Sequence, residues 1–406
     1  MNTPLPPVRA TIALGAATIL WDCIVVGAGP AGAATSLRLA REGKRVLLVD
    51  RGCMPRGKVC GCCLSPEAVV ELGRLRLPLL RRASIPLDTL ALSSGGRTAR
   101  IAFRGGEVLS RETLDTELVV AGVAGGVAWV PGVDVVAVVA PQEGPVRVTL
   151  RSVADGTVAT IEADRCVLAT GLVDRVRGKA RDRATEDRRG VRAAGKRCVI
   201  GVGTTLPADA VDLHHGELRM TVGRQGYCGL VRLEDGRIDV AAAIDRAALR
   251  EGRGVADVLL AVLGPTSAAV GPHLADALRS ARLTATPALT RRAPLSSDGG
   301  RILRVGDAAA YVEPFTGEGI GWALASARIA ADAILAGASG GGVGDAYARA
   351  HDRHFVVPHA RCRRVVSWLQ NPALVTAAVA SSRIAPGLAA RIVSLVTGAG
   401  GRGARL

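Results

Sequence analysis

Residues 22–50 read Asp22-Cys-Ile-Val-Val-Gly-Ala-Gly-Pro-Ala-Gly-Ala-Ala-Thr-Ser-Leu-Arg-Leu-Ala-Arg-Glu-Gly-Lys-Arg-Val-Leu-Leu-Val-Asp50, and this stretch decides the fold. Residues 23–26 are a short apolar run that is typical of a buried parallel strand. Residues 30–42 favour a helix that Gly43 ends, and 45–49 form a second apolar run. The order strand, helix, strand predicts a compact βαβ unit.

The turn between the first strand and the helix is Gly27-Ala-Gly-Pro-Ala-Gly32, a G-x-G-x-x-G pattern. Its first glycine permits a tight turn, its second lets a pyrophosphate approach the backbone, and its third lets helix and strand pack closely. The helix N-terminus offers free N–H groups and partial positive charge to the phosphates. Asp50 ends the second strand, where a carboxylate accepts hydrogen bonds from ribose hydroxyls. The stretch therefore predicts a dinucleotide site.

A second glycine-rich block lies far downstream, at Gly306-Asp-Ala-Ala-Ala-Tyr-Val-Glu-Pro-Phe-Thr-Gly-Glu-Gly319. It follows an apolar run at 301–305 and precedes a predicted helix that continues to Leu335. Asp307 would then lie beside the same crevice and hold hydroxyls of a ribityl chain. The start of the helix would direct its positive end at the anionic edge of a reduced flavin. This block favours FAD over NAD(P) as the bound dinucleotide.

Both glycine motifs resemble those of the flavoprotein superfamily of para-hydroxybenzoate hydroxylase and geranylgeranyl reductase. Further segments are similar to family motifs: Arg111-Glu-Thr-Leu-Asp115, Leu168-Ala-Thr-Gly171, Gly226-Tyr-Cys-Gly229 and Lys58-Val-Cys-Gly-Cys-Cys-Leu-Ser65. In the segment Leu168-Ala-Thr-Gly171, Thr170 stands where the family has an acid. The resemblance implies bound FAD, with NAD(P)H as a transient reductant. The implied cofactor contacts are Gly27, Gly29, Pro30, Ala31, Gly32, Asp50, Arg51, Arg111, Val135, Gly306, Asp307, Pro314, Gly317, Gly319 and Ile320.

The expected architecture is α/β. A Rossmann-like FAD-binding domain with a parallel sheet would comprise residues 20–75, 104–180 and 285–345. An antiparallel substrate or cap sheet would comprise 76–103 and 181–284, and 346–406 would form C-terminal helices. The glycines between 337 and 344 predict a flexible connection. The apolar stretch 365–396 is expected to pack against the cap, with a membrane surface as the alternative.

The amino-acid composition limits the classes of protein to which this chain can belong. The 406-residue chain has 52 Lys+Arg and 36 Asp+Glu, a formal net charge of +16. Its ten aromatic residues (4 Trp, 3 Tyr and 3 Phe) are too dispersed for a nucleic-acid surface, so we expect no nucleic-acid partner. No apolar run is long enough to span a bilayer. The nine cysteines do not form a secreted disulfide framework, and we expect a cytoplasmic protein, with peripheral membrane contact as an open alternative.

No residue stands out as the catalytic acid, base or nucleophile. Cys60 and Cys62 are candidates for a thiol near the flavin, acting as proton donor or redox partner. Glu318, at the predicted start of a helix, is a third candidate. The cysteine spacing lacks the paired C-x2-4-C arrangement of a zinc site, so we expect no metal.

The predicted function is hydride transfer between FAD and a hydrophobic, polyketide- or isoprenoid-like substrate. The alternative is an NAD(P)H-using aromatic monooxygenase on the same flavin scaffold. A basic binding protein for nucleic acid or membrane is the alternative from another class. The cap residues carry no legible pocket chemistry, so the sequence does not identify the substrate.

Overall fold

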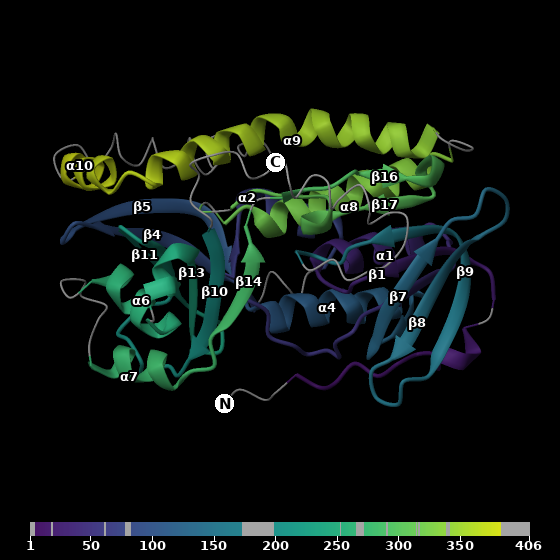
Figure 1. Cartoon of the computed structure of the whole chain (residues 1–406), viewed down its shortest axis with the longest axis horizontal. Coiled ribbons are helices and arrows are strands. Elements are labelled where there is room, and N and C mark those ends of the chain that lie inside the picture. The colour runs from purple at the N-terminus through teal and green to yellow at the C-terminus, as the bar shows by residue number, and fades with distance from the viewer. Residues whose placement is uncertain are drawn as a thin grey trace.

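The computed structural model describes residues 5–17, 19–60, 62–77, 83–172, 199–251, 253–264, 272–289, 291–313, 315, 317–337 and 342–382. Two large sheets lie side by side in Figure 1, with sheet A on the right and sheet B on the left. A long helix, α9 (Gly342–Leu369), runs across the top of both, and α10 (Pro372–Ser382) continues it over sheet B. The predicted α/β fold with C-terminal helices is confirmed.

Sheet A is a parallel sheet with an antiparallel extension. Its central strand β1 (Trp21–Val26) is buried almost throughout, as expected of an apolar run covered on both faces. β1 pairs in parallel with β2 on one side and β9 on the other. The strand order of sheet A is β16 (Ser296–Ser297), β17 (Ile302–Arg304), β9 (Val158–Leu168), β1, β2 (Val46–Val49) and β6 (Ala128–Val130). In addition, β8 (Val146–Ser152) pairs with β9 and with β7 (Val133–Val139).

Helices cover one face of sheet A and form its main core. They are α1 (Pro30–Arg41), α2 (Pro66–Arg74), α4 (Arg111–Ala124) and α8 (Gly319–Leu335). Leu37 of α1, Leu118 of α4 and Leu324 of α8 belong to one buried apolar cluster. The carboxyl ends of parallel strands lie along one edge of the sheet. The starts of α1 and α8 therefore lie at the same edge.

Sheet B is the cap sheet, and it differs in one pair from the antiparallel sheet that the sequence predicts. β11 runs parallel to β4, because a long connection separates them in the chain. α6 (Val255–Leu263) and α7 (Pro272–Ser280) cover one face. The strand order is β14 (Thr284–Ala288), β10 (Val199–Leu206), β13 (Ile238–Asp245), β12 (Gly226–Arg232), β11 (Glu217–Gly223), β4 (Ile85–Ser94), β5 (Arg97–Val108) and β3 (Cys63–Leu64).

The remaining elements are short. β15 (Arg291–Arg292) pairs with β18 (Ala310–Tyr311). Single 3-10 turns occupy Leu14–Ala16, Arg246–Glu251, Asp298–Gly300 and Gly306–Ala308. The predicted borders of the two domains stay a prediction, although sheet B reaches Val108 and Ala288, beyond the predicted limits of the cap.

The start of α9 corrects one expectation. Gly342 to Gly344 belong to the helix and not to a flexible connection. Gly344 approaches Gly300 so closely that a Cβ on Gly300 would lie 2.5 Å from the Gly344 nitrogen. The glycines there serve a close backbone contact.

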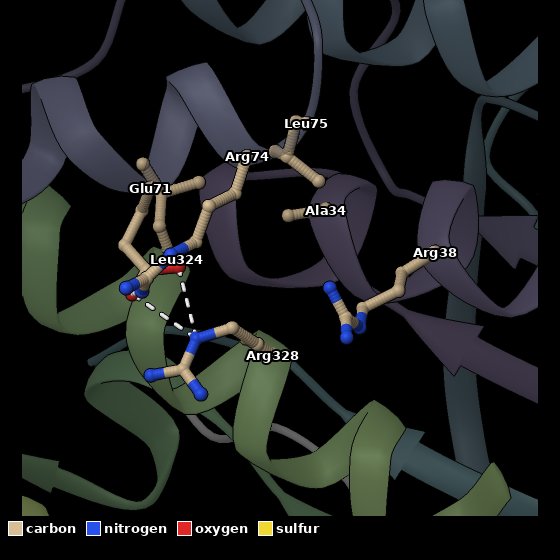
Figure 2. A pocket seen from close by; sticks show the side chains of 7 residues that line it. All are labelled: Ala34, Arg38, Glu71, Arg74, Leu75, Leu324 and Arg328. Carbon is tan, nitrogen blue, oxygen red and sulfur yellow. Dashed lines mark hydrogen bonds and ion pairs between the residues drawn. The ribbon is translucent and has the colours of Figure 1, made fainter. Parts of the chain in front are cut away.

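Figure 2 shows where α1, α2 and α8 meet, around the buried carboxylate of Glu71. Both of its oxygens accept hydrogen bonds from Arg328 Nε at 3.1 Å, and Arg74 pairs with it from the same helix. The enclosed space is about 10 Å³, enough for at most one water molecule. This junction therefore fixes the helices and is too small for a ligand.

Candidate functional site

The first glycine turn has the geometry that a diphosphate requires. Gly27 has φ +102°, and a Cβ there would lie 2.4 Å from the Ala169 carbonyl oxygen. A Cβ on Gly32 would lie 1.8 Å from the Gly27 oxygen. No side chain caps α1 at Gly29, and its first turn holds no acid. The positive end of α1 is thus kept clear, as anion binding demands.

Asp50 lies at the end of β2, directly beside this turn. Its Oδ2 accepts a hydrogen bond from Ala28 N at 2.6 Å, and its Oδ1 accepts one from Gly52 N at 2.7 Å. Arg56 forms a two-pronged ion pair with the same carboxylate. The Asp50 carboxylate is therefore held in a fixed position at the end of β2, beside the first glycine turn. The neighbouring Arg51 directs its side chain to Asp134 on β7 instead, at 3.4 Å.

The second glycine turn meets the first. Val305 N donates to the Leu168 oxygen at 3.0 Å, which continues the pairing of β17 with β9. A Cβ on Gly306 would lie 2.9 Å from Ala31 Cβ, so this turn packs directly on the first turn of α1. Asp50 and Asp307 consequently flank α1 at the same edge of sheet A.

The third glycine turn precedes α8. Gly317 has φ +73°, and a Cβ there would lie 3.2 Å from Cys63 Cβ. No side chain caps the helix, and the buried Glu318 at its start accepts a hydrogen bond from Arg361 Nη2 of α9 at 2.9 Å. Gly319 and Ile320 form the first turn. The predicted contact Pro314 lies outside the described residues.

Arg111 and Lys58 supply positive charge to the same edge. Arg111 is buried at the start of α4 and holds Asp115 through two hydrogen bonds of 2.9 and 2.7 Å. Its Nη2 lies 3.7 Å from the position of a Cβ on Gly29. Lys58 Nζ lies 3.4 Å from a Cβ on Gly171, within electrostatic reach of Arg111 and Asp307. Arg111 thus brings a positive charge to the open end of α1, whereas burial, followed by the charge of Arg111, lowers the pKa of the nearby Lys58 amine.

The loop before β3 carries the candidate thiols. A hydrogen bond with Cys62, helped by the charge of Arg111, lowers the pKa of the half-buried Cys60 to about 6. The same contact and burial raise the pKa of Cys62. Burial likewise raises the pKa of Cys63. Cys60 is therefore a thiolate at neutral pH, and its two neighbours keep their protons.

The cap sheet closes over this loop. A Cβ on Gly203 of β10 would lie 3.0 Å from Val59 Cγ1, so the loop packs directly on the sheet. Asp239 of β13 is buried, and burial, followed by the charge of Cys60, raises its pKa well above the ordinary value. Its Oδ2 has no hydrogen-bond partner among the described residues.

Aromatic residues gather where β12 of the cap meets the turn before α8. Tyr227 and Phe315 pack edge to face, with ring centroids 4.9 Å apart. Burial raises the pKa of the Glu313 carboxyl, while a hydrogen bond from Tyr227 partly offsets the effect. Burial and the charges of Asp307 and Cys60 also raise the pKa of Tyr311. In a chain with three Tyr and three Phe, three of the six lie here.

These residues fit a bound flavin dinucleotide. The buried Thr170 hydroxyl, beside Gly27 at the end of β9, has no hydrogen-bond partner among the described residues, so it is available to a ligand. The helix starts of α1 and α8 lack side-chain caps. One predicted contact lies elsewhere: Val135 of β7 packs against the apolar cluster on the opposite side of sheet A.

The histidines of α9 have partners within the protein. His354 hydrogen-bonds Glu67 at 2.7 Å, and His351 and His359 pack against Phe355. Within the described ranges, no three His, Cys, Asp or Glu side chains group as a metal site. Sequence reasoning gave no role to Asp239, Tyr311 or Phe315. The scarcity of Tyr and Phe was the one signal that could have drawn attention to the aromatic pair.

Comparison with known proteins agrees with this geometry. Residues 21–206 match the family model described as pyridine nucleotide-disulphide oxidoreductase. These similarities show an FAD-dependent oxidoreductase, which confirms the predicted enzyme class and cofactor, and the chain is similar to the flavoprotein superfamily that includes geranylgeranyl reductase.

Individual proteins are similar to this chain in sequence or in fold. The chain is 29% identical to menaquinone reductase of Mycolicibacterium smegmatis, over 78% of this chain and 76% of that protein. It is 27% identical to the chloroplastic geranylgeranyl diphosphate reductase of Oryza sativa subsp. japonica, over 78% and 67%. A solved flavoprotein/dehydrogenase from Cytophaga hutchinsonii has the same fold, with a TM-score of 0.71, 17% identity and 93% of each chain covered.

Proposed function

We propose that this protein reduces a carbon–carbon double bond of an isoprenoid-like substrate. The observation that carries the proposal is the apolar cluster that joins the cap sheet to the third glycine turn. Its buried members include Cys62, Leu87, Leu90, Met220 and Val222, and Tyr227 and Phe315 pack against the cluster. The contact between the cap sheet and this turn is therefore apolar and aromatic, a setting that suits a hydrocarbon chain.

The proton-bearing groups in this cluster supply the second half of the reduction. Bound FAD, when reduced, supplies the hydride. The product also needs one proton at the neighbouring carbon. Burial raises the pKa of the Glu313 carboxyl, which favours its protonated form, and Tyr227 hydrogen-bonds it. We assign Glu313 as the proton source, with Tyr227 orienting its carboxyl group. The uncapped start of α8 stabilises negative charge at the cofactor edge.

An open groove offers room for the chain of such a substrate. Its volume is about 500 Å³, within the range of small-molecule sites. It is lined by α2, β4 and β5. Pro66, Val69, Pro86 and Leu87 are its apolar side chains, and Asp88 and Glu107 add two carboxyl groups. Leu87 also belongs to the apolar cluster beside the glycine turn, so the groove adjoins the proposed reaction site.

The named substrates of the two relatives share the same chemistry, because menaquinone and geranylgeranyl diphosphate both carry polyprenyl chains. We infer that NAD(P)H reduces the cofactor transiently and that a small hydrophobic molecule is the second substrate. An aromatic monooxygenase is the alternative function, and the experiment must distinguish it from the proposed reductase.

The test is an anaerobic two-step reaction. The purified holoenzyme is reduced with NADH or NADPH and then mixed with geranylgeranyl diphosphate or menaquinone. We expect the flavin absorbance to return without oxygen and the product to be heavier by one H₂. Glu313→Gln should be reduced by NAD(P)H at the normal rate but form product at least about tenfold more slowly. Reoxidation only by oxygen, with a hydroxylated aromatic product, would establish the monooxygenase instead.

A further inference from the structure

The outer face of α9 and α10 exposes large apolar side chains. Val356 and Val357 are 57% and 73% exposed, Trp368 is 54% exposed, and Leu374 on α10 is 44% exposed. The inner side of the same helices is packed, since Phe355 and Cys362 of α9 and Val375 of α10 are buried. Both helices thus turn apolar side chains to the outside as well as to the body of the protein.

The same face is positively charged. Arg353, Arg363 and Arg364 are exposed on α9. The sequence contains no Asp or Glu from Arg353 to the last residue, Leu406. The nearest acids are engaged, because Asp352 pairs with Arg292 at 3.2 Å and Glu67 with His354 at 2.7 Å. Helical spacing places Arg353, Val357, Arg364 and Trp368 on one side of α9.

This face adjoins the proposed reaction site. Val375 and Val379 on the inner side of α10 belong to the apolar cluster that contains Cys62, Tyr227 and Phe315. Figure 1 shows α10 lying over β4 and β5, at the same end of the molecule as the cap. A hydrocarbon that enters beside α10 would therefore meet the apolar side of the cap sheet directly.

Among the described residues, no helix combines the length and the apolar character needed to cross a bilayer. We propose that the α9–α10 face, defined by Arg353, Val356, Val357, Arg364, Trp368 and Leu374, docks on the surface of an anionic bilayer. Apolar residues next to arginines and a tryptophan are the composition of helices that lie in the membrane interface. Anionic headgroups complement the acid-free arginine face.

Vesicle flotation of the full-length holoenzyme tests this proposal without any turnover, so its outcome is separate from that of the proposed reaction. We expect binding to vesicles of phosphatidylcholine with phosphatidylglycerol, weaker binding to phosphatidylcholine alone, and loss of binding at high salt. Replacing Arg353 and Arg364 together by Gln should weaken binding roughly 25-fold. Val357→Asp should also weaken it, whereas Val158→Asp, at a 59% exposed position on β9, should not.

Tryptophan fluorescence gives a second readout. Trp21, Trp129 and Trp322 are buried, so Trp368 is the exposed member of the four. Brominated lipids in the vesicles should quench its emission. The proposal is wrong if anionic vesicles are not bound, or if Val357→Asp binds like the parent. It is also wrong if Trp368 is already shielded from an aqueous quencher without lipid, either by residues 383–406 or by a second copy of the chain.

Discussion

At the scale of single residues, Gly29 and Gly32 of the same motif are constrained by different interactions. Gly32 is required by the fold, because a Cβ there would collide with the Gly27 oxygen at 1.8 Å. Gly29 is not required by the fold, because a Cβ there would meet only Arg111 Nη2, at 3.7 Å. Its absent side chain leaves space for the cofactor diphosphate.

We therefore predict that Gly29→Ala separates folding from cofactor binding. The variant should unfold at nearly the parent temperature but bind FAD on the order of tenfold more weakly, about 1.4 kcal/mol. Thermal melts of the apoprotein and FAD titration measure the two effects. Gly73→Ala, at an open position of α2, is the matched control and should keep parent affinity. Full FAD retention by Gly29→Ala would show that the diphosphate lies elsewhere.

The thiol pair Cys60–Cys62 gives a prediction of pH dependence. The hydrogen bond with Cys62 lowers the pKa of Cys60 to about 6, so the reactive thiolate is lost as the pH falls through that value. Alkylation of Cys60 by iodoacetamide should therefore rise to half its maximal rate near pH 6. Peptide mass spectrometry measures this rate, with the exposed Cys53 as an internal reference. Cys62→Ala should move the midpoint upward, and an unchanged midpoint would contradict the assigned contact.

At the scale of secondary-structure elements, Glu71 connects α2 to α8 (Figure 2). Because its carboxylate is buried between two arginines, Glu71→Gln removes the buried charge that Arg74 and Arg328 share and leaves Arg328 paired only with Asp332, at 3.7 Å. We predict a loss of about 2 kcal/mol in the free energy of unfolding, measured by urea denaturation. The control is Glu162→Gln, which removes a half-exposed pair with Arg147 and should cost less than about 0.5 kcal/mol. Equal losses in both variants would disprove the structural role of Glu71.

The elements differ in how far the sequence predicts them. β1, α1 and β2 follow from apolar runs and glycines that act within a few residues of each other. The parallel pairing of β11 with β4 does not, because it depends on contacts between Met220 and Leu92 that are distant in sequence. The helical start at Gly344 depends in the same way on its approach to Gly300.

In the candidate site, the glycine turns were predictable from the local sequence pattern. The approach of Asp239 to Cys60, and of Tyr227 to Glu313, required the cap to be in place.

At the scale of the whole molecule, the turn between β12 and β13 of the cap is anchored to the start of α4. Glu234 accepts hydrogen bonds from Ser110 N at 2.9 Å, Ser110 Oγ at 2.6 Å and Thr113 Oγ1 at 2.7 Å. Arg237 of the same turn pairs with Glu112 at 2.6 Å. Arg111, whose guanidinium faces Gly29, lies between these contacts. The position of the cap and that of a cofactor-binding arginine are therefore coupled through one helix start.

We predict that Glu234→Ala loosens this coupling without unfolding either sheet. Hydrogen exchange at residues 110–113 and 234–237 should become faster, while exchange in β1 and β2 stays slow, because only the three hydrogen bonds of Glu234 are lost and the Arg237–Glu112 pair remains. FAD should dissociate faster by several-fold, since Arg111 loses the support of its neighbours. Glu143→Gln, on an exposed turn before β8, is the control and should leave exchange and FAD dissociation unchanged. If Glu234→Ala releases FAD at the parent rate although exchange at 110–113 has increased, then cofactor retention does not depend on the seating of the cap.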